Sequence, residues 1–78
     1  MADAVADVVT EMVAKYFRIP REAVDLSSPI EKAGDSLQLS ELVIALEQRF
    51  DVTLDDAALA RVVRLGDLVA LVEERLRR

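Results

Sequence analysis

The sequence predicts an all-α fold, a small four-helix bundle with three longer helices, one short helix and a long first loop. Apolar residues make up 53% of the chain but aromatic residues only 4%, which favours an aliphatic helical core over strands. Apolar residues also recur at helical spacing in three separate segments. The length of residues 1–78 suits a single domain, which by size alone buries only about 60% of the surface its unfolded chain exposes.

The first helix is predicted by an apolar stripe that recurs every three or four residues between Val5 and Tyr16. It should end ahead of Pro20, because the residue before a proline is disfavoured in the α region. From Pro20 to Gly34, prolines and serines separate scattered apolar residues, which predicts a long loop with one helical turn near residues 21–24. Three apolar residues are expected to hold this loop against the core: Val24, Leu26 and Ile30.

The second helix has a start signal of its own. Asp35 can accept hydrogen bonds from backbone N–H groups as the N-cap, and the side chain of Gln38 can reach back to it, as in a capping box. Ser36 is then the first helical residue. The core-facing stripe of this helix consists of Leu39, Leu42, Val43, Leu46 and Phe50.

Two large aliphatic residues of the second helix, Leu37 and Ile44, fall opposite its core stripe on the helical wheel. They are two turns apart, are flanked by acids, and lie near the end of the helix that carries Ser36. We interpret this side as a docking face for partner proteins, with incidental exposure as the simpler alternative. The predicted docking residues are Asp35, Leu37, Glu41, Ile44 and Glu47.

A short third helix is predicted from Ala57 to about Arg61, with Asp55 or Asp56 as its cap. These two acids and Asp51 are close in sequence, but they have neither the alternating ligands nor the central glycine of a calcium loop. We therefore interpret the acids as helix caps and predict no metal site.

The last helix is predicted by an apolar stripe from Leu65 to Leu76, with arginines at its end, where cations suit the helix dipole. Its start lacks a good cap, because Arg64 stands in the N-cap position. Gly66 also weakens the first turn. We expect this helix to be poorly capped and to fray at its start.

Composition argues against several classes of function. The chain has no histidine and no cysteine, so Ser36 has no evident base to activate it and no disulfide can form. The sequence therefore predicts no enzyme activity.

No segment approaches the roughly 20 apolar residues that a membrane span needs, and no signal peptide is evident at the N-terminus. We expect a monomeric cytoplasmic protein that binds no membrane.

Charge is distributed unevenly along the chain, whose net charge is −5. Nine acids and two bases lie between Glu22 and Asp56, whereas the remaining residues include six acids and eight bases. Such an acidic segment repels nucleic acid and attracts basic protein surfaces. We expect partners with basic docking surfaces and no nucleic acid, with a merely solvated acidic surface as the alternative.

The residues around Ser36 carry a resemblance to a known family. The run Gly34-Asp35-Ser36-Leu37, followed by ELVIALEQRFD, resembles the attachment site and acidic second helix of acyl carrier proteins. The resemblance extends from about Val5 to Leu76 and implies that Ser36 carries 4′-phosphopantetheine as a phosphodiester. It also implies the acyl-carrier arrangement of the helices.

The same resemblance implies a function and a set of partners. A phosphopantetheinyl transferase would load the serine from coenzyme A, and acyl-loading, condensing and modifying enzymes would then act on thioester-bound intermediates. The pathway would be fatty-acid, polyketide or related biosynthesis. Some members of the family fold the acyl chain into the bundle, and the residues expected to line such a groove are Leu46, Phe50, Leu54, Val62 and Leu68.

Two alternatives remain open from the sequence. The fatty-acid type usually has Leu-Gly-Ala ahead of the Asp-Ser pair, whereas this chain has Lys32, Ala33 and Gly34. The Gly-Asp-Ser order is closer to the peptidyl carrier pattern, which would imply an aminoacyl cargo in nonribosomal peptide biosynthesis. An alternative of another class is an acidic helical interaction module with no prosthetic group. The cargo, the pathway, the partner enzymes and the loading state do not follow from the residues.

Overall fold

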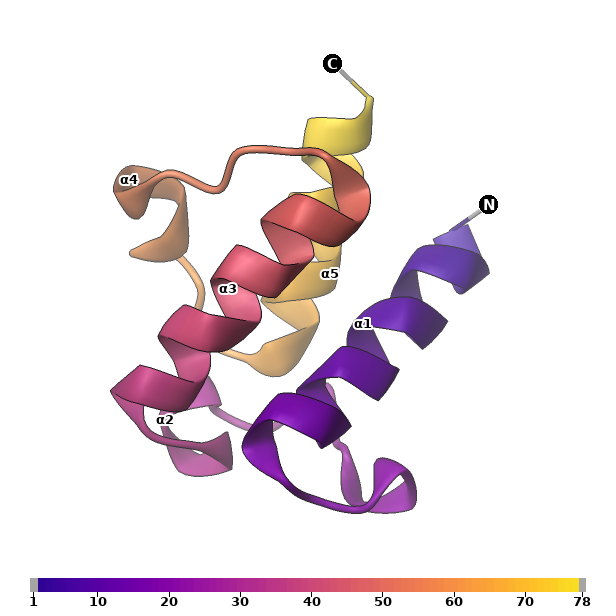
Figure 1. Cartoon of the computed structure of the whole chain (residues 1–78), viewed down its shortest axis with the longest axis vertical. Coiled ribbons are helices and arrows are strands. Elements are labelled where there is room, and N and C mark those ends of the chain that lie inside the picture. Colours follow the sequence, from indigo (N-terminus) through magenta and orange to yellow (C-terminus); the bar gives the residue numbers. More distant parts are fainter. Residues whose placement is uncertain (1, 78) are drawn as a thin grey trace.

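Three long helices make up most of the computed structural model, which describes residues 2–77: α1 (Ala2–Phe17), α3 (Ser36–Phe50) and α5 (Leu65–Leu76). In Figure 1, α1 runs in the opposite direction to α3 and α5. The shorter elements are η1 (Arg21–Ala23), α2 (Ile30–Ala33) and α4 (Asp56–Leu59). No strand forms within the described range, and the predicted all-α bundle is confirmed. The short helix α2 is not predicted from the sequence, which indicates a loop from Pro20 to Gly34.

The core lies where the three long helices meet. α1 packs against both α3 and α5, and its apolar stripe buries Val9, Val13 and Phe17. Because these side chains are aliphatic or aromatic and almost fully removed from water, their burial is the main favourable term in folding. The other buried residues of the core are Leu42, Val43, Leu46, Leu54, Leu65, Leu68, Val69 and Val72.

The end of α1 agrees with the sequence prediction. Arg18 adopts a left-handed conformation, with φ of 58°, and the Ile19 N–H donates to Ala14 O at 3.0 Å. This 6→1 bond is typical of a Schellman ending. Pro20 follows directly and cannot continue the helix.

The long first loop is held to the start of α5 by backbone hydrogen bonds. The Gly66 N–H donates to Leu26 O at 2.7 Å, and the Leu65 N–H donates to Ser28 O at 3.1 Å. The Ile30 N–H donates to Val63 O at 2.8 Å. The three predicted anchor residues, Val24, Leu26 and Ile30, all pack against the core.

The start of α5 differs from the prediction. The Asp67 carboxylate accepts hydrogen bonds from the Val63 and Arg64 N–H groups, at 2.9 and 3.0 Å. The guanidinium of Arg64 donates to Ser27 O at 2.7 Å. The expectation of a poorly capped start is therefore wrong, because the capping carboxylate lies inside the first turn instead of at the N-cap. At Gly66, a Cβ would lie 3.1 Å from Leu26 O, so glycine permits the loop to approach.

Candidate functional site

The N-terminus of α3 is built by the predicted capping box. The Asp35 carboxylate accepts from the Gln38 N–H at 2.8 Å, and Gln38 Oε1 accepts from the Asp35 N–H at 3.1 Å. Asp35 itself is extended, with φ of −88° and ψ of 175°, as an N-cap residue should be. Two reciprocal bonds thus fix the direction in which the helix starts.

Ser36 is the first residue of α3, and its side chain is exposed. The first turn of the helix contains no acid. The backbone N–H groups of Ser36 and Leu37 have no acceptor inside the helix, as at any helix N-terminus, and the positive end of the helix dipole lies here. The hydroxyl is therefore accessible, and its surroundings suit a negatively charged substituent such as a phosphate.

Ser36 has no histidine or cysteine beside it. The chain contains neither histidine nor cysteine, and the side chain of the neighbouring Asp35 is engaged in capping. The chain therefore contains no Ser–His pair of the kind that activates a nucleophilic serine.

The predicted docking residues fall into two groups. Leu37 and Ile44 are 71% and 55% exposed, and Asp35 and Glu41 are also exposed. Glu47 differs, because it is partly buried and its Oε2 accepts from the Leu54 N–H at 2.8 Å.

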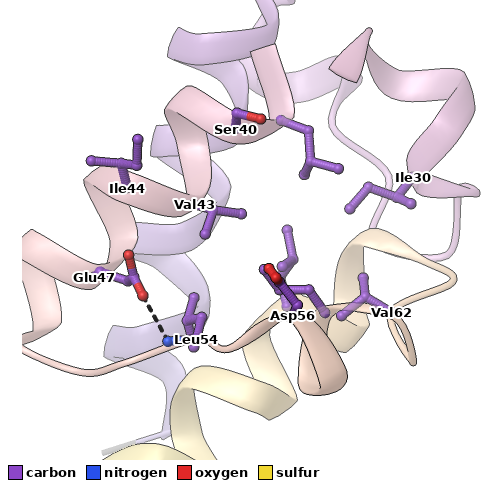
Figure 2. Close-up of a pocket in the computed structure, with 11 residues that line it drawn as sticks. Ile30, Ser40, Val43, Ile44, Glu47, Leu54, Asp56 and Val62 are labelled. Atoms are coloured by element: carbon purple, nitrogen blue, oxygen red, sulfur yellow. Dashed lines mark hydrogen bonds between the residues drawn. The ribbon is translucent and has the colours of Figure 1, made fainter. Parts of the chain in front are cut away.

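A cavity of about 370 Å³ lies between α3 and the α4 region, beginning one helical turn after Ser36. In Figure 2 the α3 residues line one side of it, and Ile30 and Val62 lie on the other. The lining is mainly aliphatic, with polar atoms from three residues. The lining residues are Ile30, Leu39, Ser40, Val43, Ile44, Glu47, Leu54, Asp56, Leu59, Val62 and Leu68.

The structure corrects the groove predicted from the sequence. Leu54, Val62 and Leu68 line the cavity, but Leu46 and Phe50 do not. Leu46 lies about 100° around the helix from Glu47 and is fully buried in the core. Phe50 lies about one turn beyond the cavity, where it packs against the core at the end of α3.

The sequence reading missed several residues that line the cavity. Leu39 and Val43, predicted in the core stripe, and Ile30, predicted to anchor the loop, do belong to the core or pack against it, but they also line the cavity. Leu59 had no role. Their apolar character was visible in the sequence, but no local signal distinguishes a side chain facing a cavity from one packed in a core.

Two of the acids after α3 are helix caps, and one of these two also forms an ion pair. The Asp55 carboxylate accepts from the Ala58 N–H at 2.8 Å and lies 3.5 Å from the guanidinium of Arg75. Asp51 is the left-handed C-cap of α3. Within residues 2–77, no group of three or more acidic, histidine or cysteine side chains could hold a metal ion.

Two carboxyl groups have lowered pKa values. The Asp67 pKa is lowered by the backbone N–H groups of Arg64 and Val63. The Asp25 pKa is lowered by hydrogen bonds from the side chain and backbone of Ser27. Asp67 caps the start of α5 and Asp25 holds the turn at Ser27, and neither residue lies on α3.

None of the helices in the described part of the chain has the length and apolar character that crossing a bilayer requires.

Comparison with known proteins gives a consistent picture. A family model described as a phosphopantetheine attachment site matches residues 7–72. The chain is 34% identical over 73 residues to an acyl carrier protein of Campylobacter curvus, covering 91% of this chain and 95% of that protein. It is 33% identical over 72 residues to the acyl carrier protein of Wolinella succinogenes, covering 90% and 95%. With the acyl carrier protein of a Sulfurovum species it shares 35% identity over 72 residues, covering 90% and 96%.

Proposed function

The chain belongs to the acyl carrier protein family, with a covalently attached 4′-phosphopantetheine, and from this premise we propose that Ser36 Oγ is the attachment atom. The observation that carries the proposal is the position of Ser36. Its exposed hydroxyl stands at the first residue of α3, beside a capping box and one turn from the cavity. Among residues 2–77, no other serine follows an aspartate at the start of a helix.

The residues around Ser36 fit the chemistry of attachment. The hydroxyl oxygen forms a phosphodiester bond to the phosphopantetheine of coenzyme A, while the pyrophosphate bond of coenzyme A breaks and adenosine 3′,5′-bisphosphate leaves. We assign the base that removes its proton to the phosphopantetheinyl transferase, because this chain has no histidine and the neighbouring Asp35 carboxylate caps the helix. The helix N-terminus and the acid-free first turn favour a phosphate there. Bound in this way, the group supplies a flexible arm whose terminal thiol holds an acyl chain as a thioester.

The function of the chain is then to present a thioester-bound acyl group to partner enzymes of fatty-acid, polyketide or related biosynthesis, without a catalytic step of its own. Relatives named as acyl carrier proteins support an acyl cargo over an aminoacyl one. The Gly-Asp-Ser order is closer to the peptidyl carrier pattern because of Gly34, and the structure gives a separate reason for this glycine. A Cβ at Gly34 would lie 2.8 Å from the ring of Phe17, so packing requires glycine whatever the cargo.

The partners are enzymes with basic docking surfaces. Leu37 and Ile44 offer exposed apolar contacts, and the exposed Glu41 lies between them on α3. Partners that combine apolar and basic side chains would match this surface, since complementary charge accelerates encounter and apolar contact stabilises the complex.

The test is to incubate the protein with a promiscuous phosphopantetheinyl transferase and coenzyme A and to measure the intact mass. One group should be added to the parent and none to Ser36→Ala. The variant Ser40→Ala is a matched control, because Ser40 is also exposed and lies one turn further along α3. It should gain the group as the parent does. A shift that persists in Ser36→Ala would refute the assignment.

Thiol titration gives an independent measure. The chain has no cysteine, so a thiol reagent should find no thiol before loading and one thiol afterwards. An unmodified interaction module would show no thiol under either condition.

A further inference from the structure

We infer that Glu47 couples partner docking to the cavity: its carboxylate fixes Leu54 in the cavity wall, and a cation on a docked partner draws the carboxylate away and releases Leu54. The inference rests on the proposed carrier function, because it concerns how the acyl chain is held and released. Glu47 acts through Leu54 and is a positioning residue.

The first observation is the bond between these two residues. Glu47 Oε2 accepts from the Leu54 N–H at 2.8 Å, drawn as a dashed line in Figure 2. Leu54 lies in the irregular segment between α3 and α4, where its N–H has no helical acceptor. Its side chain is only 4% exposed and lines the cavity. The carboxylate therefore takes the place of a backbone acceptor. By holding the Leu54 backbone, it also holds the Leu54 side chain in the wall of the cavity.

The second observation is that Glu47 is also accessible to a partner. It is partly buried and lines the cavity together with Ile44, which is 55% exposed. A partner that covers Ile44 thus meets one edge of the cavity. The docking face and the cavity wall share these two side chains.

The third observation concerns charge. Within residues 2–77, Glu47 has no basic side chain at ion-pairing distance, since the acids in ion pairs are Asp7, Glu11, Asp55 and Glu74. A lysine or arginine of a partner would find this carboxylate unpaired. The bond from the Leu54 N–H already gains from the charge on the carboxylate, but a cation on the partner adds the attraction of a full opposite charge and therefore competes for the same oxygen atoms.

Release of Leu54 would open the cavity on the side of the α3–α4 segment. The Leu54 N–H would lose its acceptor, and the segment would keep the bond from the Val52 N–H to Glu47 O but lose the one at Leu54. An acyl chain lying in the cavity would then become accessible from the same side on which the partner is docked.

The first test uses the unloaded protein and is independent of carrier function. Amide hydrogen exchange at Leu54 should be at least about tenfold faster in Glu47→Ala, because a hydrogen bond to a charged acceptor is lost. In Glu47→Gln the side chain keeps an acceptor oxygen, and exchange should stay closer to the parent. Glu41→Ala is the matched control, since Glu41 is an exposed acid of the same helix and does not line the cavity. Unchanged exchange at Leu54 in Glu47→Ala would overturn the inference.

The second test measures the coupling. Phosphopantetheinyl transferase, added without coenzyme A, should accelerate exchange at Leu54 in the parent severalfold. It should have little effect on Glu47→Gln, whose neutral side chain attracts a cation weakly. Equal acceleration in both proteins, or none in the parent, would overturn the coupling.

The third test uses protein loaded with an octanoyl thioester. Hydroxylamine should cleave the thioester severalfold faster in Glu47→Ala than in the parent or in Glu41→Ala, and equal rates would refute a role in protecting the chain. Failure to load the parent at Ser36 would refute the carrier function. The role of Glu47 is tested separately, by the rate of amide hydrogen exchange at Leu54.

Discussion

Gly34 lies directly against the ring of Phe17. A Cβ at residue 34 would come within 2.8 Å of Phe17 Cδ1 and 2.6 Å of Gln38 Oε1. The backbone at Gly34 is extended, with φ of −170°, so any residue could adopt its conformation. Space, and not backbone torsion, therefore requires glycine here. Because Phe17 is only 4% exposed, its ring cannot move aside without disturbing the core.

Replacement of Gly34 by alanine should destabilise the fold by about 1–3 kcal/mol, the usual cost of adding a methyl group to a packed site. Urea denaturation of the two proteins would measure this difference. The variant Phe17→Leu tests the cause, because a smaller side chain at residue 17 should reduce the cost of Gly34→Ala in a double-mutant cycle. If the two substitutions are additive, another contact excludes the methyl group.

Replacement of Arg18 by glycine should stabilise the protein. Arg18 is exposed and adopts a left-handed conformation, with φ of 58°, which costs an L-residue about 1–2 kcal/mol. Glycine removes this cost but adds entropy to the unfolded chain, so the net gain should be roughly 0.5–1 kcal/mol. Thermal and chemical denaturation would measure it. As a control, Arg18→Ala keeps the strain and should give no gain.

Replacement of Asp67 by alanine should destabilise the protein at neutral pH and have little effect in acid. The backbone N–H groups of Arg64 and Val63 hold the pKa of Asp67 below its ordinary value of 3.8. A carboxyl group with a lowered folded-state pKa contributes stability above its unfolded pKa, and the contribution is lost as pH falls through the folded value. The difference between parent and variant should therefore shrink as the pH falls below 3.8.

Denaturation of the parent and Asp67→Ala across an acid pH series would test this dependence. Glu73→Ala provides a control on the same helix for the loss of one negative charge. A difference between the parent and Asp67→Ala that stays constant with pH would show that the carboxylate does not cap α5.

Charge reversal at Glu41 should slow loading of Ser36. Glu41→Lys removes an exposed acid from the docking face, so encounter with a basic transferase should slow by about 3–10-fold at low salt. The difference should diminish as salt screens the charges. Glu73→Lys has the same net charge but lies on α5, and it should load nearly as fast as the parent. Initial loading rates over a sodium chloride series would measure this effect, and equal rates for the parent and Glu41→Lys would refute docking through this face.

Much of the structure around Ser36 follows from local sequence. The capping box of Asp35 and Gln38 spans four consecutive residues, and the end of α1 ahead of Pro20 could be predicted from the proline. The exposure of Leu37 and Ile44 follows from their positions on the helical wheel. These features could be predicted because each depends on residues within one or two turns of a single helix.

The tertiary structure alone decided the cavity and the start of α5. Apolar periodicity shows which side of α3 is buried, but not which neighbouring element that side meets. Leu46 therefore belongs to the core, whereas Ile30 and Leu59, from other elements, help to line the cavity. Arg64 and Glu47 are likewise polar residues whose partners, Ser27 and Leu54, lie outside their own helical turns. Sequence spacing cannot reveal such pairs, because the packing of separate segments creates them.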